Sequence, residues 1–183
     1  MKIHGLLLLL FIGMPLLCRA QWLSGIATKW NDSFIEWAVF DETGEEAGSL
    51  EIRWKRRLDW SVWDYQVGEE RGSIKLSFAN DPSQWVIRGP DEIITARTRW
   101  INDLREWRIT NNSITLIFKS RWKNNFNEWL VDDGEKYGNF AVATEWEGDP
   151  RNWQILDELD EDISLTMKMA MVFIAIYHSS PRQ

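Results

Sequence analysis

Apolar and polar residues alternate along most of this chain in short segments, and these segments recur at a regular interval. An aromatic residue ends each segment, at Trp30, Trp54, Phe78, Trp100, Trp122 and Trp146, so that the interval is 22 to 24 residues. Alternation with a period of two is typical of a strand with one buried and one solvated face. The pattern therefore predicts a repeated unit built from antiparallel strands.

A second position completes each unit, seven residues after the closing aromatic. It is occupied by Trp37, Ser61, Trp85, Trp107, Trp129 and Trp153, and only Ser61 departs from the pattern. The segment between the two positions is polar and rich in Asn and Asp, which tolerate the backbone geometry of turns. Each unit is therefore expected to be a hairpin, with an apolar residue such as Leu58 or Phe126 plugging the barrel end at its turn.

Twelve strands follow from this pattern. They are expected near residues 23–30, 35–41, 48–55, 60–67, 71–78, 84–88, 92–100, 106–110, 113–122, 128–132, 137–146 and 152–156. An open twisted sheet rarely carries so many strands, and closure removes the exposed edges. We predict an all-β, up-and-down fold, namely a twelve-stranded antiparallel closed β-barrel that forms a single domain over residues 21–183.

The segment after the last predicted strand is apolar on almost every side. Residues 165–177 contain one charged residue, Lys168, and they are too few to span a membrane, which takes about twenty. A helix with no polar face must be buried, and a barrel of twelve strands is too wide for wall side chains alone to fill. We predict a helix over about 163–178, buried in the barrel lumen, with Ser164 or Asp162 as its N-cap.

Charged residues near these elements add to this picture. The acidic run 157–162 is expected to stabilise the positive end of the helix, and a calcium site is the alternative, since carboxylate oxygens ligate calcium. An outer-membrane barrel is disfavoured, because Arg97 and Arg99 would then face lipid. No transmembrane span is expected in the mature chain.

The first twenty residues have the features of a secretory signal peptide. Lys2 precedes the apolar run 6–14, and Cys18 and Ala20 stand at positions −3 and −1 of a cleavage site. Cleavage near Ala20 predicts a secreted or periplasmic protein. A lipoprotein anchor on Cys18 is disfavoured, since Leu17 stands where a lipobox needs a small residue. Removal of this segment leaves 19 basic and 28 acidic residues, a net charge of −9, and no cysteine.

Thirteen tryptophans are far above ordinary usage for one small domain. Ten of them occupy the repeat positions, and they are expected to pack in the core as large apolar side chains. Trp22, Trp60 and Trp63 fit the repeat least well. Trp60 is expected to face away from Trp63 and is therefore a candidate for contact with a glycan.

Residues suited to catalysis are scarce. The mature chain has a single histidine, His178, and no cysteine, which excludes a Cys–His pair and disfavours a Ser–His–Asp triad and the usual zinc and copper sites. A carboxylate-based hydrolase is the weakest hypothesis, because Glu106 and Glu128 recur at equivalent positions and so indicate support of a turn. We predict no catalytic residue, no cofactor and no metal, and hence no enzyme.

The charge is unevenly distributed along the chain. Residues 51–123 hold 14 basic and 10 acidic residues within an acidic protein. Alternating charges of this kind usually mark only a solvated barrel wall, and a nucleic-acid partner is disfavoured by the net charge. The alternative is a surface for anionic lipid headgroups, made of Arg53, Lys55, Arg56, Arg57, Trp60, Arg97, Arg99, Arg121 and Lys123.

The last predicted hairpin, Trp146-Glu-Gly-Asp-Pro-Arg-Asn-Trp153, leads to the apolar segment Met167-Lys-Met-Ala-Met-Val-Phe-Ile-Ala-Ile-Tyr177. In this order of twelve antiparallel strands followed by an apolar helix, over about residues 23–178, the chain resembles the Tubby C-terminal-like superfamily, which includes phospholipid scramblases and LURP-one-related proteins. The resemblance is one of architecture, carries no catalytic signature and implies an association with anionic lipid headgroups. The sequence thus indicates an exported, non-catalytic binding domain of unknown ligand, with lipid headgroups or glycans at the cell envelope as alternatives.

Overall fold

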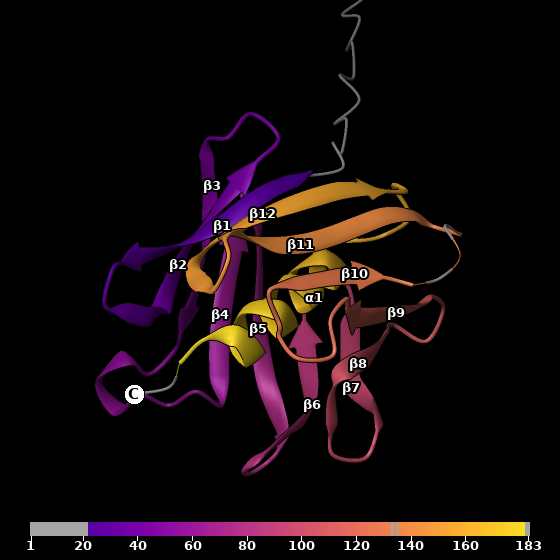
Figure 1. Cartoon of the computed structure of the whole chain (residues 1–183), viewed down its shortest axis with the longest axis horizontal. Helices are drawn as coiled ribbons and strands as arrows, with labels where there is room; N and C mark the ends of the chain where they lie inside the picture. Colours follow the sequence, from indigo (N-terminus) through magenta and orange to yellow (C-terminus); the bar gives the residue numbers. More distant parts are fainter. Residues whose placement is uncertain (1–21, 133, 135, 182–183) are drawn as a thin grey trace, which may run out of the picture.

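The computed structural model describes residues 22–132, 134 and 136–181. The predicted signal peptide and its cleavage site lie outside the described residues. Twelve antiparallel strands form a closed barrel, in which each strand pairs with its neighbours along the chain and β12 pairs with β1 (Figure 1). The strands are β1 Leu23–Trp30, β2 Ser33–Asp41, β3 Glu46–Ile52, β4 Val62–Val67, β5 Glu70–Phe78, β6 Asp81–Arg88, β7 Ile93–Trp100, β8 Asp103–Thr110, β9 Thr115–Ser120, β10 Glu128–Val131, β11 Gly138–Trp146 and β12 Asp149–Leu159. The predicted fold class is confirmed.

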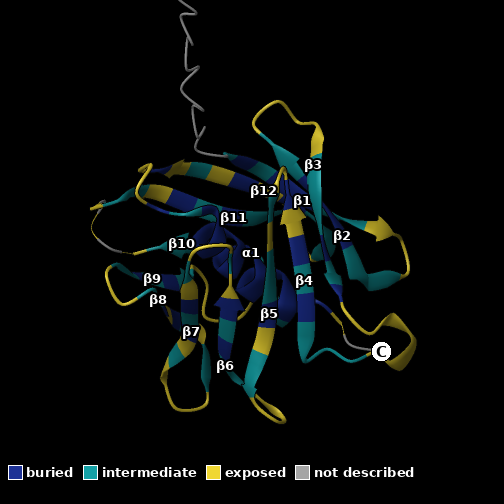
Figure 2. Ribbon diagram, turned by 180° about the vertical axis from the view of Figure 1, so that it is seen from behind, coloured by how far each residue is buried: buried dark blue, intermediate teal, exposed yellow. Residues whose placement is uncertain are grey.

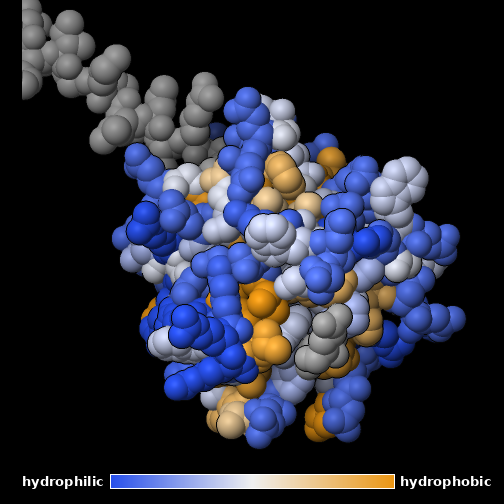
Figure 3. All heavy atoms as spheres, turned by 90° about the vertical axis from the view of Figure 1, so that its left-hand side faces the viewer, coloured by the Kyte–Doolittle hydropathy of each residue, from blue (hydrophilic) through white to orange (hydrophobic). Residues whose placement is uncertain are grey.

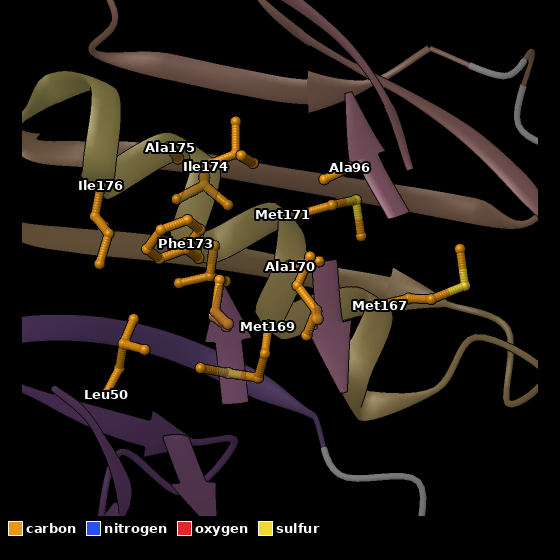
Figure 4. Packing of buried hydrophobic residues seen from close by; sticks show 14 of the residues in the cluster. Leu50, Ala96, Met167, Met169, Ala170, Met171, Phe173, Ile174, Ala175 and Ile176 are labelled. Carbon is orange, nitrogen blue, oxygen red and sulfur yellow. The ribbon is translucent and has the colours of Figure 1, made fainter. Parts of the chain in front are cut away.

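The helix α1, Leu165–Ser179, fills the inside of the barrel (Figure 1). Its residues from Leu165 to Tyr177 are all buried (Figure 2). The hydroxyl of Ser164 caps the helix by accepting a hydrogen bond from the backbone N–H of Met167 at 3.2 Å. Three methionines, Met167, Met169 and Met171, precede Phe173 on the helix (Figure 4), and their flexible side chains suit the irregular gaps between helix and wall. Among the described residues, no helix has the length and apolar character needed to cross a membrane.

A layer of six buried tryptophans joins each hairpin to the core. These residues are Trp37, Trp63, Trp85, Trp107, Trp129 and Trp153. The indole N–H of each donates to the backbone carbonyl of the residue three positions earlier, at 2.8 to 3.0 Å. A buried indole N–H needs such a partner. The bond also fixes the turn against the barrel wall, which explains why the same spacing recurs in every unit.

The second hairpin departs from the repeat by two residues. Trp63, and not Ser61, takes the place of the buried tryptophan, since its N–H donates to the carbonyl of Trp60. Trp60 therefore occupies the turn position that the pattern assigned to Leu58, and the short helix η1, Lys55–Arg57, takes up the extra length. Leu58 is exposed and does not plug the barrel end. A two-residue insertion inside a turn shifts the spacing without changing the strands on either side.

One ion pair is enclosed together with the helix. The Lys168 ammonium lies 2.9 Å from Oδ2 of Asp157, and the two side chains are only 2% and 1% exposed. The same oxygen accepts a hydrogen bond from the backbone N–H of Leu23 at 3.1 Å, and the ammonium lies 4.8 Å from the centre of the Trp22 ring. Because Asp157 belongs to β12 and Leu23 to β1, the pair ties the helix to the seam of the barrel.

This arrangement corrects one expectation for the acidic run. Asp157 serves a buried pair rather than the helix N-terminus, which is capped by Ser164, one of the two predicted caps. Within residues 22–132, 134 and 136–181, no three His, Cys, Asp or Glu side chains gather into a group that could hold a metal ion.

A buried phenol joins the barrel wall to the first turn of the helix. The hydroxyl of Tyr65, on β4, lies 3.0 Å from that of Thr166. Burial raises the pKa of Tyr65 to about 12, because the phenolate would lose its water shell inside the barrel. The folded protein therefore keeps this proton at a pH where the unfolded chain loses it.

Alkaline pH is expected to destabilise the protein through Tyr65. Between a pH of about 10, the ordinary pKa of tyrosine, and about 12, only the folded state binds the proton, so the free energy of unfolding falls by up to about 1.4 kcal/mol per pH unit. Urea unfolding at several pH values in this window would measure the slope. The Tyr65→Phe variant should have a shallower slope than the parent and than a Tyr137→Phe control. Equal slopes in all three proteins would contradict the assignment.

Candidate functional site

Six aromatic side chains stand exposed at one end of the barrel, one at the tip of each hairpin. They are Trp30, Trp54, Phe78, Trp100, Trp122 and Trp146, and between 52% and 65% of each residue is exposed. We call this set the aromatic crown. All six lie at the same end because the turns of an up-and-down barrel alternate between its two ends. Five of the ten tryptophans expected in the core are thus on the surface, which corrects the sequence prediction.

The physical reason is a break in the alternation just before the crown. In the hairpins β1–β2, β5–β6, β7–β8 and β11–β12, the pairing register shifts immediately before the crown residue. At each shift one residue of the first strand faces three of the second, as Arg99 faces residues 104–106, and an irregularity of this kind redirects the side chains beside it. Trp54 and Trp122 instead follow the last residues of β3 and β9. A strict period of two therefore predicts that these side chains face the core, whereas they are exposed to solvent.

Two neighbouring hairpins hold their crown residue in the same way. The indole N–H of Trp100 donates to Oε2 of Glu106 at 2.8 Å, while the Arg99 guanidinium pairs with Oε1 and lies 5.5 Å from the ring centre. In the next hairpin, the indole N–H of Trp122 donates to Oε2 of Glu128 at 3.1 Å. The Arg121 guanidinium lies 2.8 Å from the other oxygen of that carboxylate.

This bracket of arginine, tryptophan and glutamate has a clear physical effect. The carboxylate fixes the polar edge of the indole and neutralises the arginine, so the ring stays in one orientation and remains more than half exposed. An indole ring that the glutamate already fixes before the ligand binds loses little conformational entropy on binding. Glu106 and Glu128, which the sequence assigns to turn support, thus act by positioning Trp100 and Trp122.

A polar groove borders the bracket of Trp122. It has a volume of about 460 Å³ and lies between the β9–β10 connection and the β11–β12 hairpin, where it is lined by Trp122, Asn125, Asn127, Glu128, Ala143, Thr144 and Glu147. The groove combines one aromatic ring with amide, hydroxyl and carboxylate groups. Both hydrogen-bond donors and acceptors are therefore available next to a flat apolar ring.

A second and larger hollow lies between the β3–β4 connection and the β5–β6 hairpin. Its volume is about 650 Å³, and it is lined by Leu58, Asp59, Trp60, Ser61, Lys75, Leu76, Ser77, Ala79, Asn80, Pro82 and Tyr177. Trp60, the ring singled out from the sequence, is partly buried here and packs edge-on against Trp63 at 5.4 Å and Tyr177 at 6.2 Å. Trp60 therefore packs against Trp63 and does not face away from it, which corrects the sequence prediction, while it also lines the hollow.

The basic residues proposed from the sequence lie on three separate parts of the crown end. Arg53, Lys55, Arg56 and Arg57 belong to the β3–β4 connection, Arg97 and Arg99 to β7, and Arg121 and Lys123 to the β9–β10 connection. They do not form one continuous strip along a single hairpin.

Several of these basic groups are already paired. Arg53 binds Asp64, and Lys55 binds both Glu36 at 3.0 Å and Glu51 at 2.7 Å. The hydrogen bond that Arg53 donates to Asp64 raises the pKa of Arg53, and the one that Lys55 donates to Glu51 raises the pKa of Lys55. Because Arg99 and Arg121 are paired as well, much of the positive charge is neutralised within the protein.

The opposite end of the barrel is acidic. The connections β2–β3, β4–β5, β6–β7 and β12–α1 carry Glu42, Glu45, Glu69, Asp91, Glu92, Asp160, Glu161 and Asp162. Burial and the nearby charges of Glu92 and Asp91 raise the pKa of Glu70. The molecule is thus strongly polarised, with a nearly neutral, aromatic crown at one end and negative charge at the other.

Figure 3 shows a side of the molecule on which hydrophobic residues gather in the middle and hydrophilic residues surround them. Apolar surface of this kind commonly marks a contact site.

The brackets can be recognised in the sequence. A basic residue precedes the crown position, and a glutamate follows six positions later, in the hairpins of Trp30, Trp100 and Trp122. No comparable sequence pattern indicates that the crown rings are exposed to solvent.

Comparison with known proteins gives no relative. No protein-family model, no curated protein and no solved structure matches this chain. The geometry of the crown end is therefore the basis for inferring what the protein binds.

Proposed function

We propose that this protein is an exported, non-catalytic binding domain that recognises carbohydrate with its aromatic crown. The observation that carries the proposal is the pair of brackets around Trp100 and Trp122, in which a carboxylate holds the indole edge and leaves the ring open. The apolar C–H face of a sugar ring packs well on a flat aromatic ring, while its hydroxyls need hydrogen-bond partners. The crown end provides both.

The groove beside Trp122 fits one or a few sugar residues. Its amides Asn125 and Asn127 and the hydroxyl of Thr144 surround the ring with donors and acceptors. Ligand sites commonly combine apolar contact area with a few placed polar groups in this way. The crown repeats its aromatic rings around the barrel, so a polymer that contacts several of them gains affinity through high effective concentration.

The charges at the hairpin tips favour sugar over a lipid bilayer. Asp32, Asp103, Glu147 and Asp149 lie in the turns or at the strand ends beside the crown rings. Arg105 and Arg151 pair with Asp103 and Asp149 and lower the pKa values of these carboxyls, so these two tips carry no surplus of positive charge that would attract an anionic surface. Insertion of the rings into a bilayer would carry these carboxylates towards the headgroups, which is unfavourable for an anionic surface.

The net charge also favours an uncharged ligand. The mature chain carries a net charge of −9, and its far end is acidic, so long-range forces repel anionic polymers and anionic membranes. From the resemblance of its sequence we infer that the chain is a secreted member of the Tubby C-terminal-like superfamily, whose expected fold is a barrel closed around a helix. Anionic lipid headgroups, the ligands that this resemblance implies, are therefore the competing hypothesis to test.

Replacing both bracketed tryptophans by alanine is expected to abolish most of the carbohydrate affinity. Each stacked ring contributes on the order of 1–2 kcal/mol, so the Trp100→Ala/Trp122→Ala variant should bind at least about 30-fold more weakly. Retardation in native gels that contain soluble xylan, mannan, starch or hydroxyethylcellulose would measure the change. Thermal stability should be unaffected, because both rings are exposed.

A matched control uses exposed apolar residues away from the crown. Ile93 and Leu156 are about half exposed, and the Ile93→Ala/Leu156→Ala variant should be retarded as strongly as the parent. The proposal fails if none of these uncharged polysaccharides retards the parent protein. It also fails if vesicles of phosphatidylcholine and phosphatidylglycerol bind the parent through the crown, with the tryptophan variant losing that binding.

A further inference from the structure

We propose that the hollow between the β3–β4 connection and the β5–β6 hairpin is a second binding site, which takes an amphipathic anion with an apolar chain and a single anionic head. This hollow is separate from the brackets of Trp100 and Trp122, which lie on β7–β8 and β9–β10. The inference therefore goes beyond carbohydrate recognition and stands on its own observations.

The hollow lies where the repeated pattern is broken. Two extra residues lengthen the β3–β4 connection, and the hairpin that faces it has Ser77, Phe78 and Gln84 at the positions held by arginine, tryptophan and glutamate in the brackets. This hairpin therefore lacks the bracket, as the β11–β12 hairpin does with Glu145, Trp146 and Asn152, and it borders a hollow larger than the groove beside Trp122. The spacing of the repeat fails only in the unit that carries this insertion, and a local departure from a repeated pattern is where a separate role is expected.

Backbone strain marks the lip of this hollow. Leu58 has a left-handed backbone, with φ +48° and ψ +44°, and about half of it is exposed to solvent. This conformation is unfavourable for a leucine, and residues held in it tend to gather at ligand sites. Here the strained turn places an apolar side chain at the entrance to the hollow, where Leu58 is part of the lining.

The floor of the hollow is apolar. Trp60, Leu76, Pro82 and the end of the helix at Tyr177 contribute to its surface. Trp60 and Leu76 both pack against the core cluster, so this floor is supported by the barrel. A volume of about 650 Å³ lies within the usual range for small-molecule sites. An apolar chain or ring can therefore replace water on this surface.

The polar side of the hollow offers a positive charge and a hydroxyl. Lys75 is exposed and, among the described residues, has no ion-pair partner, unlike Lys55 and Lys119. The hydroxyl oxygen of Ser77 is buried and makes no hydrogen bond within the described part of the chain. A buried polar atom without a partner is unfavourable and marks a place where a ligand can bind.

The single carboxylate in the hollow is occupied by its own loop. Oδ1 of Asp59 accepts hydrogen bonds from the backbone N–H of Ser61 at 2.9 Å and from the Ser61 hydroxyl. Asp59 thus turns this oxygen to its own loop, whereas Lys75 has no ion-pair partner in the described part of the chain and can meet a ligand, with Ser77 as a hydroxyl donor on the same strand. The head of the ligand is therefore an anion that accepts hydrogen bonds, and its chain lies along Trp60 and Leu76.

Calorimetric titration with three ligands of equal chain length tests this inference. Decanoate and decyl phosphate, below their micelle concentrations, should bind about five-fold more tightly than decyltrimethylammonium in about 0.15 M salt, which screens the distant acidic charges more than the contact with Lys75. The Lys75→Gln variant should lose this preference, whereas a Lys119→Gln control should keep it. Trp60→Ala should weaken binding of all three ligands, since it removes part of the apolar floor.

Each result decides for or against the site. Equal affinities for the anionic and cationic amphiphiles, an unchanged preference in Lys75→Gln, or an equal loss in Lys119→Gln would overturn it. Retained decanoate binding in the Trp100→Ala/Trp122→Ala variant is the expected result, because those rings lie on other hairpins. Loss of decanoate binding in that variant would place the amphiphile on the crown rings and would refute the separate site.

Discussion

A chain that stops before Ile163 is expected not to fold cooperatively. Such a truncation removes α1, whose residues from Leu165 to Tyr177 are all buried, and leaves the inward-facing tryptophans around a wide, empty lumen. A twelve-stranded wall cannot fill that space with its own side chains. We expect the truncated chain to bind hydrophobic dyes and to lack a sharp thermal transition, which near-ultraviolet circular dichroism and calorimetry would detect.

Two further proteins make this experiment specific. A chain that ends after Pro181 keeps the whole helix and should melt like the parent. In the full-length chain, Phe173→Ala should lower the free energy of unfolding by about 3–5 kcal/mol, because the Phe173 ring packs edge-on against Trp63 and Trp85 at 5.6 and 4.7 Å. If the truncated chain melts cooperatively and stays monomeric, the helix is an appendage and this account of the core is wrong.

Breaking the buried pair from one side is expected to be the most damaging single change of charge. In Lys168→Met, the Asp157 carboxylate would stay buried without its ammonium partner, and removal of one member of a buried pair costs about 3–5 kcal/mol. The loss would show as a lower midpoint in urea unfolding with little change in the slope. The helix would lose its charged tie to the β1–β12 seam at the same time.

A double variant separates the charge from the packing. Lys168→Met/Asp157→Asn removes both charges and keeps an oxygen for the backbone N–H of Leu23, so it should recover most of the loss. Lys119→Met breaks the exposed pair with Asp132 and should cost less than about 1 kcal/mol. If Lys168→Met is no more damaging than Lys119→Met, the buried pair contributes little to stability.

The fold was predictable because its pattern is redundant. Six aromatic positions follow one another at five similar intervals, and each buried tryptophan such as Trp37 or Trp107 is surrounded by period-two strands. A helix with no polar face, such as α1, leaves few places where it can lie. These features depend on local spacing and burial, which a single sequence records directly.

The candidate site was harder to predict, for equally local reasons. The shift in register before Trp100 is a property of the pairing between two strands, and Thr98 and Trp100 carry no sign of it in their own spacing. The insertion before Trp63 moved a repeat position by two residues. Single residues at turns thus decide which rings face solvent, and those rings carry the proposed function. The assignments of Arg53 and Arg121 missed their carboxylate partners, which come from neighbouring strands.

The seam of the barrel has a consequence for how the chain folds. β1 pairs with β12 through Gly25 and Gln154, and the helix that fills the lumen follows β12 in the chain. Contacts between such distant segments form slowly, because a long loop must close before they stabilise anything. The barrel cannot complete its core until its last segment is present. If the chain is exported from its N-terminus, as proposed, the barrel can therefore close only after α1 has crossed the membrane. Until then the chain would stay unfolded and competent for transport.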